Sequence, residues 1–406
     1  MSPGFRVLDA QVPAQRAHWI RMWERSPMQL PFAHPGYGEL VLPAGGRLLA
    51  AAFEGTEGSV LYPLVLRRIG GTGLHDLASP YGYGGPLAWG GPAAAGAEAE
   101  RTPAPASTGA HAPRAELARR FWTAFDAWAG DRAVVTEFVR LSLFDDVLPY
   151  PARVRPRLVN YVRELPGTAE ELWAGMAPKV RQNVRRARRC GLSTRVDRTG
   201  AMLDDFLRIY HGTMTRLGSQ QWYRFDREFF ERLHRALPGR LAYVHAMHDG
   251  VPVSVDLVVF GADTAYYFLG GTDAEAFGLR PNELVKVHAM ELAQELGCAR
   301  FVLGGGVRTG DGLERYKRGF APEGAQMFCS GERVLDPGAY VQLTGAGRGE
   351  GAAEAEGPDV FFPAYRSPAG GLRSPAGVGA GAGKDGAADV SALRAGAVGH
   401  EREAVS

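Results

Sequence analysis

The segment between residues 241 and 272 has the clearest hydrophobic pattern in the chain. Three apolar runs, LAYVHAM, VPVSVDLVVF and TAYYFLGG, are separated by Asp249-Gly250 and by the tripeptide Gly-Ala-Asp. Short apolar runs bounded by turn residues predict strands, and Asp-Gly between two of them is a strong hairpin signal. The pattern therefore predicts an antiparallel meander of three strands.

Helices are predicted on both sides of this meander. Apolar residues recur at three- and four-residue spacing over 202–217, and a second helix is expected over 281–296. Earlier in the chain, Thr168 and Glu171 form a capping box that opens a short helix, and Pro178 suits the first turn of the next one. The block is completed by a strand at 301–303, a short helix around 312–319 and a strand near 325–329.

A similar order of elements is visible in the first half. A tryptophan-bearing helix precedes two strands at 47–53 and 60–66, and an aromatic helix precedes a β-rich run at 134–143. No sequence repeat accompanies this similarity, so duplication is indicated by element order alone. We therefore predict two tandem α/β domains of the α+β kind, 1–155 and 156–344, each with a central mixed, largely antiparallel sheet flanked by helices.

Two low-complexity stretches interrupt this organisation. Residues 91–114 are rich in Ala, Gly and Pro without a hydrophobic period, which predicts a mobile loop within the first domain. Residues 345–406 are Gly/Ala-rich and too poor in large apolar residues to bury a core, so a disordered tail is expected. The island FFPAYR at 361–366 is open to two interpretations, a segment that docks on the folded body or a chance cluster.

Composition narrows the class of protein. The 406 residues carry a formal net charge of +2, which gives no indication of a DNA partner for the whole chain. The three cysteines are widely spaced, which argues against a disulfide framework and against a zinc site. No apolar signal segment opens the chain and no run approaches the length of a membrane span. A cytoplasmic protein without a bound metal or a tightly bound cofactor is expected.

The segment PKVRQNVRRARRCG, residues 178–191, concentrates positive charge. It holds six cations within eleven residues, and Val180, Val184 and Ala187 fall on one narrow arc of the predicted helix. Two interpretations remain open: a solvated outer face, or a surface that attracts the phosphates of tRNA, CoA or a nucleotide-linked acceptor. On the second interpretation the candidate binding residues are Lys179, Arg181 and Arg185.

Several local sequences resemble the FemAB-like branch of the GNAT acyltransferase superfamily, which includes peptidyltransferases of the peptidoglycan bridge. In the second half they are the basic segment above, DGVPVSVDLVVF with AYYFLGGT, RPNELVKVHAMELAQELGCARFVLGG, and LERYKRGF. In the first half they are DLASPYGYGGP and EFVRLSLF, so the resemblance covers about residues 75–345. It implies two tandem GNAT-like domains. It also implies transfer of an activated acyl or aminoacyl group to an amine of a small-molecule or peptidoglycan-precursor acceptor.

The sequence leaves the donor open. The turn before the helix at 281–296, GTDAEAFGLRPNEL, lacks the R/Q-x-x-G-x-G/A pattern that presents backbone N–H groups to the pyrophosphate of acetyl-CoA. Gly278 and Arg280 could serve part of that role, and Asn282 could cap the helix. The missing pattern favours aminoacyl-tRNA as co-substrate, with acyl-CoA as the alternative.

Lys317 and Asp256 are the candidate catalytic residues. The resemblance implies that Lys317, in LERYKRGF, faces the donor ester or its developing oxyanion, whereas the simpler interpretation is a surface lysine. Asp256 lies in an otherwise apolar strand, where it either points outward or is buried with a partner. A carboxylate there could accept the proton of the attacking amine. Because no Ser/His/Asp order is supported, we expect direct attack in a ternary complex.

Two glycine-rich loops complete the candidate site. The loop SPYGYGGP carries Tyr81 and Tyr83, which either approach an acceptor or belong to a structural turn. Gly304 and Gly305 end a strand at the edge where α/β proteins often bind ligands. An alternative from a different class is a non-catalytic GNAT-fold module that binds RNA or a nucleotide-linked ligand in the basic groove.

Overall fold

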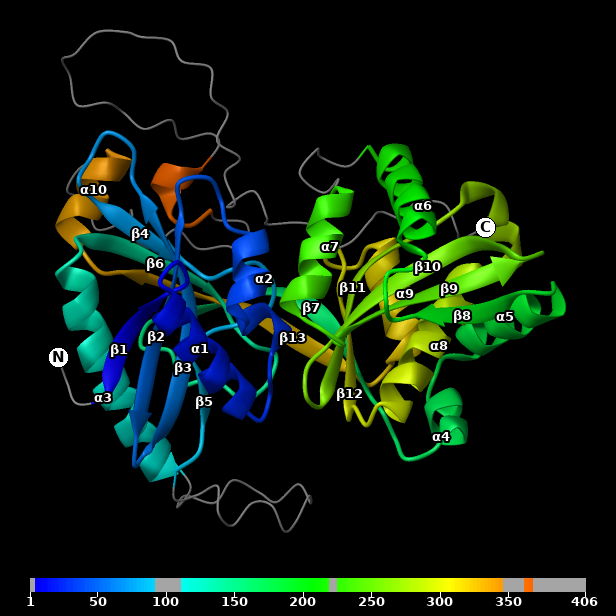
Figure 1. Cartoon of the computed structure of the whole chain (residues 1–406), viewed down its shortest axis with the longest axis horizontal. Coiled ribbons are helices and arrows are strands. Elements are labelled where there is room, and N and C mark those ends of the chain that lie inside the picture. Colours follow the sequence, from blue (N-terminus) through cyan, green and yellow to red (C-terminus); the bar gives the residue numbers. More distant parts are fainter. Residues whose placement is uncertain (1–3, 92–110, 219–224, 346–360, 368–406) are drawn as a thin grey trace, which may run out of the picture. The chain divides into compact units, whose positions relative to one another are not determined.

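The computed structural model describes residues 4–91, 111–218, 225–345 and 361–367. Two compact units make up the described part of the chain, and each contains its own set of strands and helices, as the sequence colouring of Figure 1 allows the reader to follow. None of the helices in the described ranges combines the length and apolar character that crossing a membrane requires. Of the described residues, unit 1 comprises those up to Arg157 and those from Cys329 to 367, and unit 2 comprises those from Leu158 to Phe328.

Unit 1 is organised around a mixed sheet with the strand order β1-β2-β3-β4-β6-β13, to which β5 adds beside β3. Neighbouring strands are antiparallel except β4 and β6, which are parallel. Its elements are β1 (Phe5–Asp9), α1 (Pro13–Arg25), η1 (Pro31–Ala33), α2 (Pro35–Leu40), β2 (Arg47–Gly55), β3 (Gly58–Arg68), β4 (His75–Ala78), β5 (Leu87–Trp89), α3 (His111–Gly130), β6 (Val134–Arg140), the end of β13 (Ala325–Val334), α10 (Pro337–Thr344) and η5 (Ala364–Arg366).

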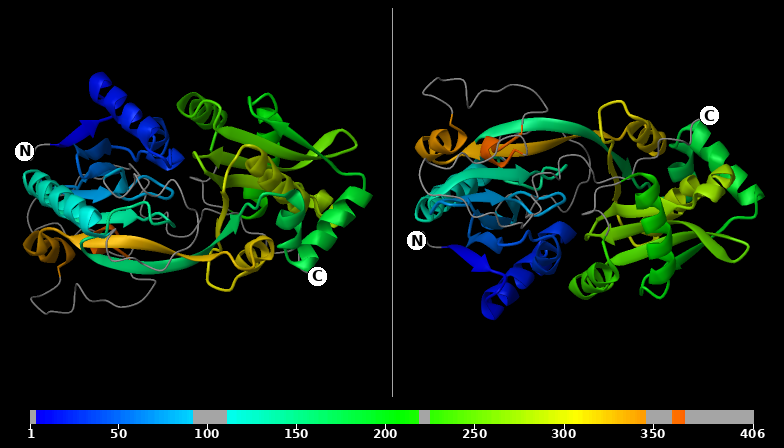
Figure 2. Two further views of the ribbon diagram at one scale, coloured as in Figure 1. Left: turned by 90° about the horizontal axis from the view of Figure 1, so that it is seen from below. Right: turned by 90° about the horizontal axis from the view of Figure 1, so that it is seen from above.

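Strand alternation divides the core of unit 1 into two layers. Leu49 and Phe53 of β2 pack with Phe121 and Phe125 of α3 in one buried cluster. On the other face, Leu48 lies so close to α2 that a Cβ on Gly38 would come within 2.8 Å of its Cδ2 atom. The views in Figure 2 show α1 and α3 on opposite sides of these strands.

Unit 2 has the strand order β7-β12-β11-β10-β9-β8, with β11 and β12 parallel and the other neighbours antiparallel. Helices α5 and α8 pack on the face that holds Val244 and Val258, and α6 packs on the opposite face against Tyr243. Its elements are β7 (Arg153–Glu164), α4 (Ala169–Ala174), α5 (Pro178–Arg189), β8 (Ser193–Asp197), α6 (Leu203–Arg216), α7 (Arg227–Ala236), β9 (Leu241–His248), β10 (Val251–Phe260), β11 (Thr264–Thr272), η4 (Ala274–Leu279), α8 (Pro281–Glu295), β12 (Arg300–Gly305) and α9 (Gly312–Phe320).

The two units repeat one order of elements. The series β1-α1-α2-β2-β3-β4-α3-β6 in unit 1 corresponds to β8-α6-α7-β9-β10-β11-α8-β12 in unit 2. The strand that follows each series is exchanged. β7 follows β6 in the chain but pairs with β12 through residues 160–164, whereas β13 follows β12 and pairs with β6 through residues 330–334. The predicted fold class, two mixed and largely antiparallel sheets flanked by helices, is confirmed.

The exchanged strands shift the domain limits away from the sequence-based ones. Residues 329–344 were assigned to the second domain, yet they belong to unit 1, because β13 pairs with β6 and α10 follows it. Of the predicted loop 91–114, residues 92–110 lie outside the described part of the chain and 111–114 already belong to α3. Most of the tail also lies outside it, but residues 361–367 are described and pack on unit 1.

Candidate active site

An ion pair joins the middle of the unit 2 sheet to its central helix. Asp256 of β10 shares its strand face with Val258, which packs against α8, so its carboxylate points inward. Lys286 of α8 places Nζ 2.7 Å from Oδ2 of Asp256, and the two residues are only 4% and 7% exposed respectively. Of the two interpretations of Asp256, the structure supports the buried carboxylate with a partner.

Two ammonium groups approach the ring of Tyr267 on β11. Nζ of Lys286 lies 3.1 Å from the ring centroid and Nζ of Lys317 lies 5.7 Å from it. Lys317 is 1% exposed and donates a hydrogen bond of 2.8 Å to the carbonyl of Gly305. The interpretation of Lys317 as a surface lysine is therefore wrong, because the side chain is buried beside an aromatic ring that favours cations.

Local sequence explains how Lys317 reaches this position. Leu313, Lys317 and Phe320 fall on one face of α9, and all three are buried. The helix begins at a fixed point, since Asp311 accepts a hydrogen bond of 2.7 Å from the backbone N–H of Glu314. The N-cap therefore fixes the start of the helix, and helical spacing then turns Lys317 toward the sheet.

Glycine is required where β12 passes β7. A Cβ on Gly305 would stand 2.6 Å from the carbonyl oxygen of Val159, closer than side chains tolerate. The carbonyl of Gly305 is the acceptor for Lys317, so this close approach positions the ammonium. Gly304, beside it, has a φ of 78° at an irregularity in the pairing of β12 with β7.

A second glycine leaves room for the carboxylate. A Cβ on Gly270 of β11 would stand 2.6 Å from Oδ1 of Asp256 and 2.8 Å from the hydroxyl oxygen of Tyr267. Both polar atoms therefore border the space that a side chain at residue 270 would fill. The position needs glycine because of this space, and its backbone is not in the left-handed region.

Burial governs the electrostatics of the cluster. Desolvation raises the pKa of the Asp256 carboxyl above its ordinary value, and the positive charges of Lys286 and Lys317 act in the opposite direction. A carboxyl group with a raised pKa is suited to accept and release a proton. A buried ammonium interacts strongly with developing negative charge, because little water screens it.

Helix α5 carries the basic surface that the sequence predicts. Val180, Val184 and Ala187 are buried, and its six cations lie on the other faces. None of them forms an ion pair with a carboxylate within the described ranges, although the charge of Lys179 acts on nearby Glu283. Arg181 donates to the carbonyl of Ala174 over 2.6 Å. The guanidinium carbon of Arg185 lies 5.5 Å from the centroid of the Trp173 ring, Arg188 lies 5.8 Å from it, and Lys179 is exposed.

The start of α8 differs from the expectation. Asn282 does not cap the helix, because the N-cap residue is Arg280, with a φ of 63°, and Pro281 occupies the first turn. The side-chain oxygen of Asn282 instead accepts hydrogen bonds from Ser254 over 3.1 Å and from Thr272. Residue Gly278 is exposed in η4.

A carboxylate of the chain itself stands in the first turn of α8. Glu283 accepts a hydrogen bond of 2.6 Å from the side chain of Asn183 on α5. Burial raises the pKa of Glu283, and the hydrogen bond from Asn183 lowers it. A carboxyl group at a helix N-terminus uses the same positive end of the helix that would otherwise attract a phosphate.

Tyr81 and Tyr83 belong to unit 1 and lie apart in the chain from the cluster of Asp256, Lys286 and Lys317. The guanidinium carbon of Arg140 lies 5.8 Å from the centroid of the Tyr81 ring, and the Tyr83 ring lies edge-on to Phe32 at 5.8 Å. Burial raises the pKa of both phenols above the physiological range. The two residues thus shape an aromatic loop of unit 1.

Sequence reasoning missed Lys286 and Tyr267. A signal for Lys286 was present, since it is the one charge in the run LVKVHAM of the central helix. A charged residue amid buried neighbours needs a partner, and α8 brings Asp256 of β10 to it across thirty positions of sequence. Tyr267 lies in an aromatic strand without a comparable signal.

Residues 177–318 match the family model of the acetyltransferase (GNAT) domain. They include Asp256, Lys286 and Lys317, so this cluster lies within the segment that matches the GNAT domain model. No curated protein matches the sequence.

Among solved structures, FemX has a TM-score of 0.59 at 13% identity, and the alignment covers 80% of this chain and 97% of FemX. The C-terminal domain of a putative lysylphosphatidylglycerol synthetase from Agrobacterium fabrum has a TM-score of 0.48 at 14% identity, covering 82% of this chain and 99% of that one. A tandem GNAT protein from the clavulanic acid pathway has a TM-score of 0.42 at 14% identity, covering 82% and 98%. The predicted resemblance to the FemAB-like branch is thus confirmed as a shared fold with FemX.

Proposed function

We propose that the chain is an acyltransferase that moves an activated aminoacyl group from aminoacyl-tRNA to an amine. The observation that carries this proposal is the buried cluster of Asp256, Lys286 and Lys317 within the GNAT domain. The acceptor is the amine of a small molecule or of a peptidoglycan precursor, and the donor acts as a co-substrate rather than a tightly bound cofactor. The reaction takes place in the cytoplasm, where charged tRNA is available.

Each member of the cluster has a distinct part in this reaction. The acceptor amine attacks the ester carbonyl, the C–N bond forms, and the bond to the tRNA hydroxyl oxygen breaks. Lys317 stabilises the negative charge that develops on the carbonyl oxygen. Asp256 accepts the proton that the amine loses, and the departing hydroxyl takes up a proton in turn. Lys286 holds Asp256 in place through the ion pair.

Two features favour a tRNA donor over a CoA thioester. The five arginines of α5 form no ion pair with a carboxylate among the described residues, and such a surface attracts a polyanion. The first turn of α8, where a GNAT enzyme binds pyrophosphate, already contains Glu283 and begins with a proline that has no N–H. Acyl-CoA remains the alternative donor, and a non-catalytic RNA-binding or nucleotide-ligand-binding module is the second alternative.

A donor screen tests the proposal. The purified chain is incubated with a generic amine acceptor and either a charged tRNA pool or an acyl-CoA pool, and the mass of the acceptor is measured. We expect an aminoacyl mass increase with charged tRNA that RNase abolishes. If product forms from acyl-CoA alone, the donor is acyl-CoA and the proposed tRNA donor is wrong. If tRNA binds but neither pool gives product, the non-catalytic alternative is supported.

The basic surface is tested by its dependence on salt. Replacing Arg186 and Arg189 with Gln removes two charges from α5 and should weaken tRNA binding. The slope of log K against log salt concentration should become shallower by about 0.7–0.9 per lost phosphate contact. The matched control replaces the exposed Arg232 and Arg235 of α7 with Gln. Equal losses in both variants would show that general positive charge, not α5, attracts the tRNA.

A further inference from the structure

A polar row crosses three strands of unit 1 at one level. Arg67 of β3 lies opposite Asp76 of β4, and Asp76 lies opposite Thr136 of β6 in the strand register. Asp76 and Thr136 are completely buried, and Arg67 donates a hydrogen bond of 2.7 Å to Oδ1 of Asp76. A carboxylate in such a place needs donors for both oxygens, because an unsatisfied buried oxygen is costly.

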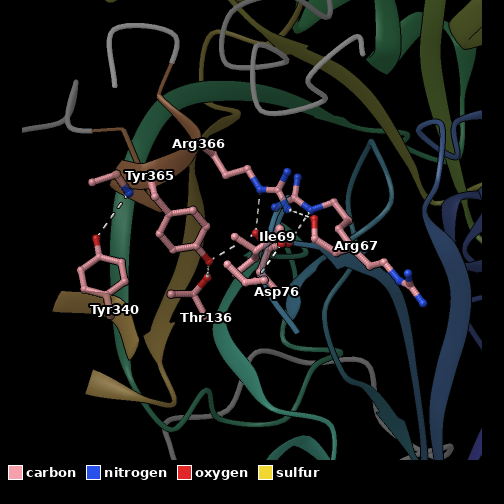
Figure 3. Close-up of polar contacts among 10 residues, drawn as sticks. Arg67, Ile69, Asp76, Thr136, Tyr340, Tyr365 and Arg366 are labelled. Carbon is pink, nitrogen blue, oxygen red and sulfur yellow. Dashed lines mark hydrogen bonds and ion pairs between the residues drawn. The ribbon is translucent and has the colours of Figure 1, made fainter. Parts of the chain in front are cut away.

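The donors to the second oxygen come from the tail segment 361–367. Arg366 donates to Oδ2 of Asp76 over 2.8 Å, and the hydroxyl of Tyr365 donates to the same atom over 3.3 Å. Thr136 and Tyr365 share a further hydrogen bond of 2.6 Å, and Figure 3 shows Tyr365 and Arg366 converging on Asp76. In the described part of the chain, Oδ2 therefore obtains its hydrogen bonds from the tail.

Aromatic packing completes the contact. Tyr340 of α10 stacks on Phe362 at 6.2 Å and meets Tyr365 edge-on at 5.9 Å. Its hydroxyl accepts a hydrogen bond of 3.4 Å from the backbone N–H of Ala364. Tyr365 is 5% exposed, so the segment fills a surface that the sheet and α10 have built.

Residues 361–367 contact unit 1 in the way that a bound peptide ligand contacts its receptor. Its bonds between backbone groups are internal, from Arg366 to Pro363 and from Ser367 to Ala364, and its one other backbone bond runs from Ala364 to the Tyr340 hydroxyl. Its contacts with the rest of unit 1 are made mainly by its side chains. They include a hydrogen bond of 2.7 Å from the Arg366 guanidinium to the backbone carbonyl of Arg68. Because no strand pairing fixes it in the chain, an identical segment from another molecule would make the same contacts.

We propose that the surface formed by Arg67, Asp76, Thr136 and Tyr340 is a peptide-binding site whose ligand, residues 361–367, is exchangeable between two copies of this chain. The chemistry that the site selects is a tyrosine followed by an arginine, with an aromatic residue and a proline before them.

Peptide binding tests the site. A full-length variant with Tyr365→Ala and Arg366→Ala keeps the site but loses its own ligand. A labelled peptide of residues 361–367 should bind this variant, and bind the wild-type chain at least tenfold more weakly because its site is occupied. An Arg366→Ala peptide should bind the variant at least tenfold more weakly, and a Ser367→Ala peptide should bind as the unmodified one does. Equal binding of the Arg366→Ala peptide, or no binding of any peptide, would overturn the proposal.

Mixing two variants tests exchange. The tail-disabled variant above is combined with an Asp76→Asn variant, which has an intact tail and a weakened site. We expect the mixture to form a complex one chain larger than either variant alone, measured by light scattering after size exclusion. An unchanged mass with both variants folded would refute exchange between copies, and the peptide measurements decide the site itself if Asp76→Asn fails to fold.

Discussion

The Nζ atom of Lys286 lies 2.7 Å from Oδ2 of Asp256, in a part of unit 2 where both side chains are buried. This pair ties the central helix to the middle strand of the sheet. It also opposes the burial that raises the pKa of the Asp256 carboxyl group, to which the proposed reaction assigns the proton of the amine. The stability of unit 2 and the proposed activity of its site therefore depend on the same contact.

Breaking this ion pair from one side should be costly. Asp256→Asn or Lys286→Met alone is expected to lower the free energy of unfolding by about 3–5 kcal/mol, because each leaves one buried charge without its partner. The double variant should lose clearly less free energy of unfolding than the two single variants lose when their losses are added. Chemical denaturation of all four forms measures the coupling, and the exposed pair Arg227 and Glu231 on α7, 3.8 Å apart, provides a control in which coupling stays below about 1 kcal/mol.

Lys317 should affect the chemical step more than binding. Replacing it with Met removes a buried ammonium at the position assigned to the oxyanion, and kcat is expected to fall by about 10²–10³ with little change in KM. Arg318→Met, one position on and exposed, is the control on the same helix. A rise in KM at constant kcat would contradict the assigned role and indicate a contribution to substrate binding instead.

Glu137 should make unit 1 less stable as the pH rises. Tyr62 and Tyr150 donate hydrogen bonds of 2.6 Å and 3.0 Å to its carboxyl group, yet burial raises its pKa to about 7. Between about pH 4.5 and 7 the unfolded chain loses this proton first, so the stabilising effect of the protonated form, complete at low pH, is lost as the pH rises.

Glu137→Gln tests this dependence because it cannot ionise. The difference in unfolding free energy between Glu137→Gln and wild type should shift in favour of the variant by about 3 kcal/mol from pH 4.5 to pH 8. Denaturant titrations at several pH values measure it. A constant difference across this range would mean that Glu137 ionises equally in the folded and unfolded chain.

His245 should make unit 2 less stable as the pH falls, which is opposite to the effect of Glu137 on unit 1. It is completely buried in β9, and its desolvation lowers the pKa of the imidazole to about 4. Below about pH 6.5 the imidazole of His245 binds a proton in the unfolded chain but stays neutral in the folded chain. The free energy of unfolding therefore falls as the pH falls toward 4. His245→Leu should remove about 2.5 kcal/mol of this acid sensitivity between pH 7.5 and 4.5. An unaltered pH profile in the variant would assign the acid sensitivity to other groups.

The sequence predicts elements with strong local signals. The meander β9-β10-β11 follows from alternating runs and the Asp249-Gly250 turn, and Thr168 caps α4 as its spacing with Glu171 indicates. Strand β7 was missed because RVRPRLVNYVRE carries charges where a half-buried strand would carry apolar residues. Two of its arginines, Arg155 and Arg157, instead form ion pairs with Glu332, to which Arg155 donates over 3.0 Å.

Local signals also predicted part of the candidate site. Asp256 stood out as a charge in an apolar strand, and helical spacing could have placed Lys317 on the buried face of α9 with Leu313. The pairing of Asp256 with Lys286 could not be predicted, because it depends on where α8 packs across the sheet. Local periodicity specifies elements and faces, and contacts between distant elements are decided by the assembled core.

The exchange of β7 and β13 has a consequence for synthesis on the ribosome. The strand that pairs with β6, residues 330–334, is translated some 190 positions after it, whereas β7 is made before the strand β12 that it will join. Domains usually complete their fold in the order in which they leave the ribosome. Here the unit that is begun first is finished last, and a nascent chain halted before residue 330 would leave the edge of β6 exposed to other strands.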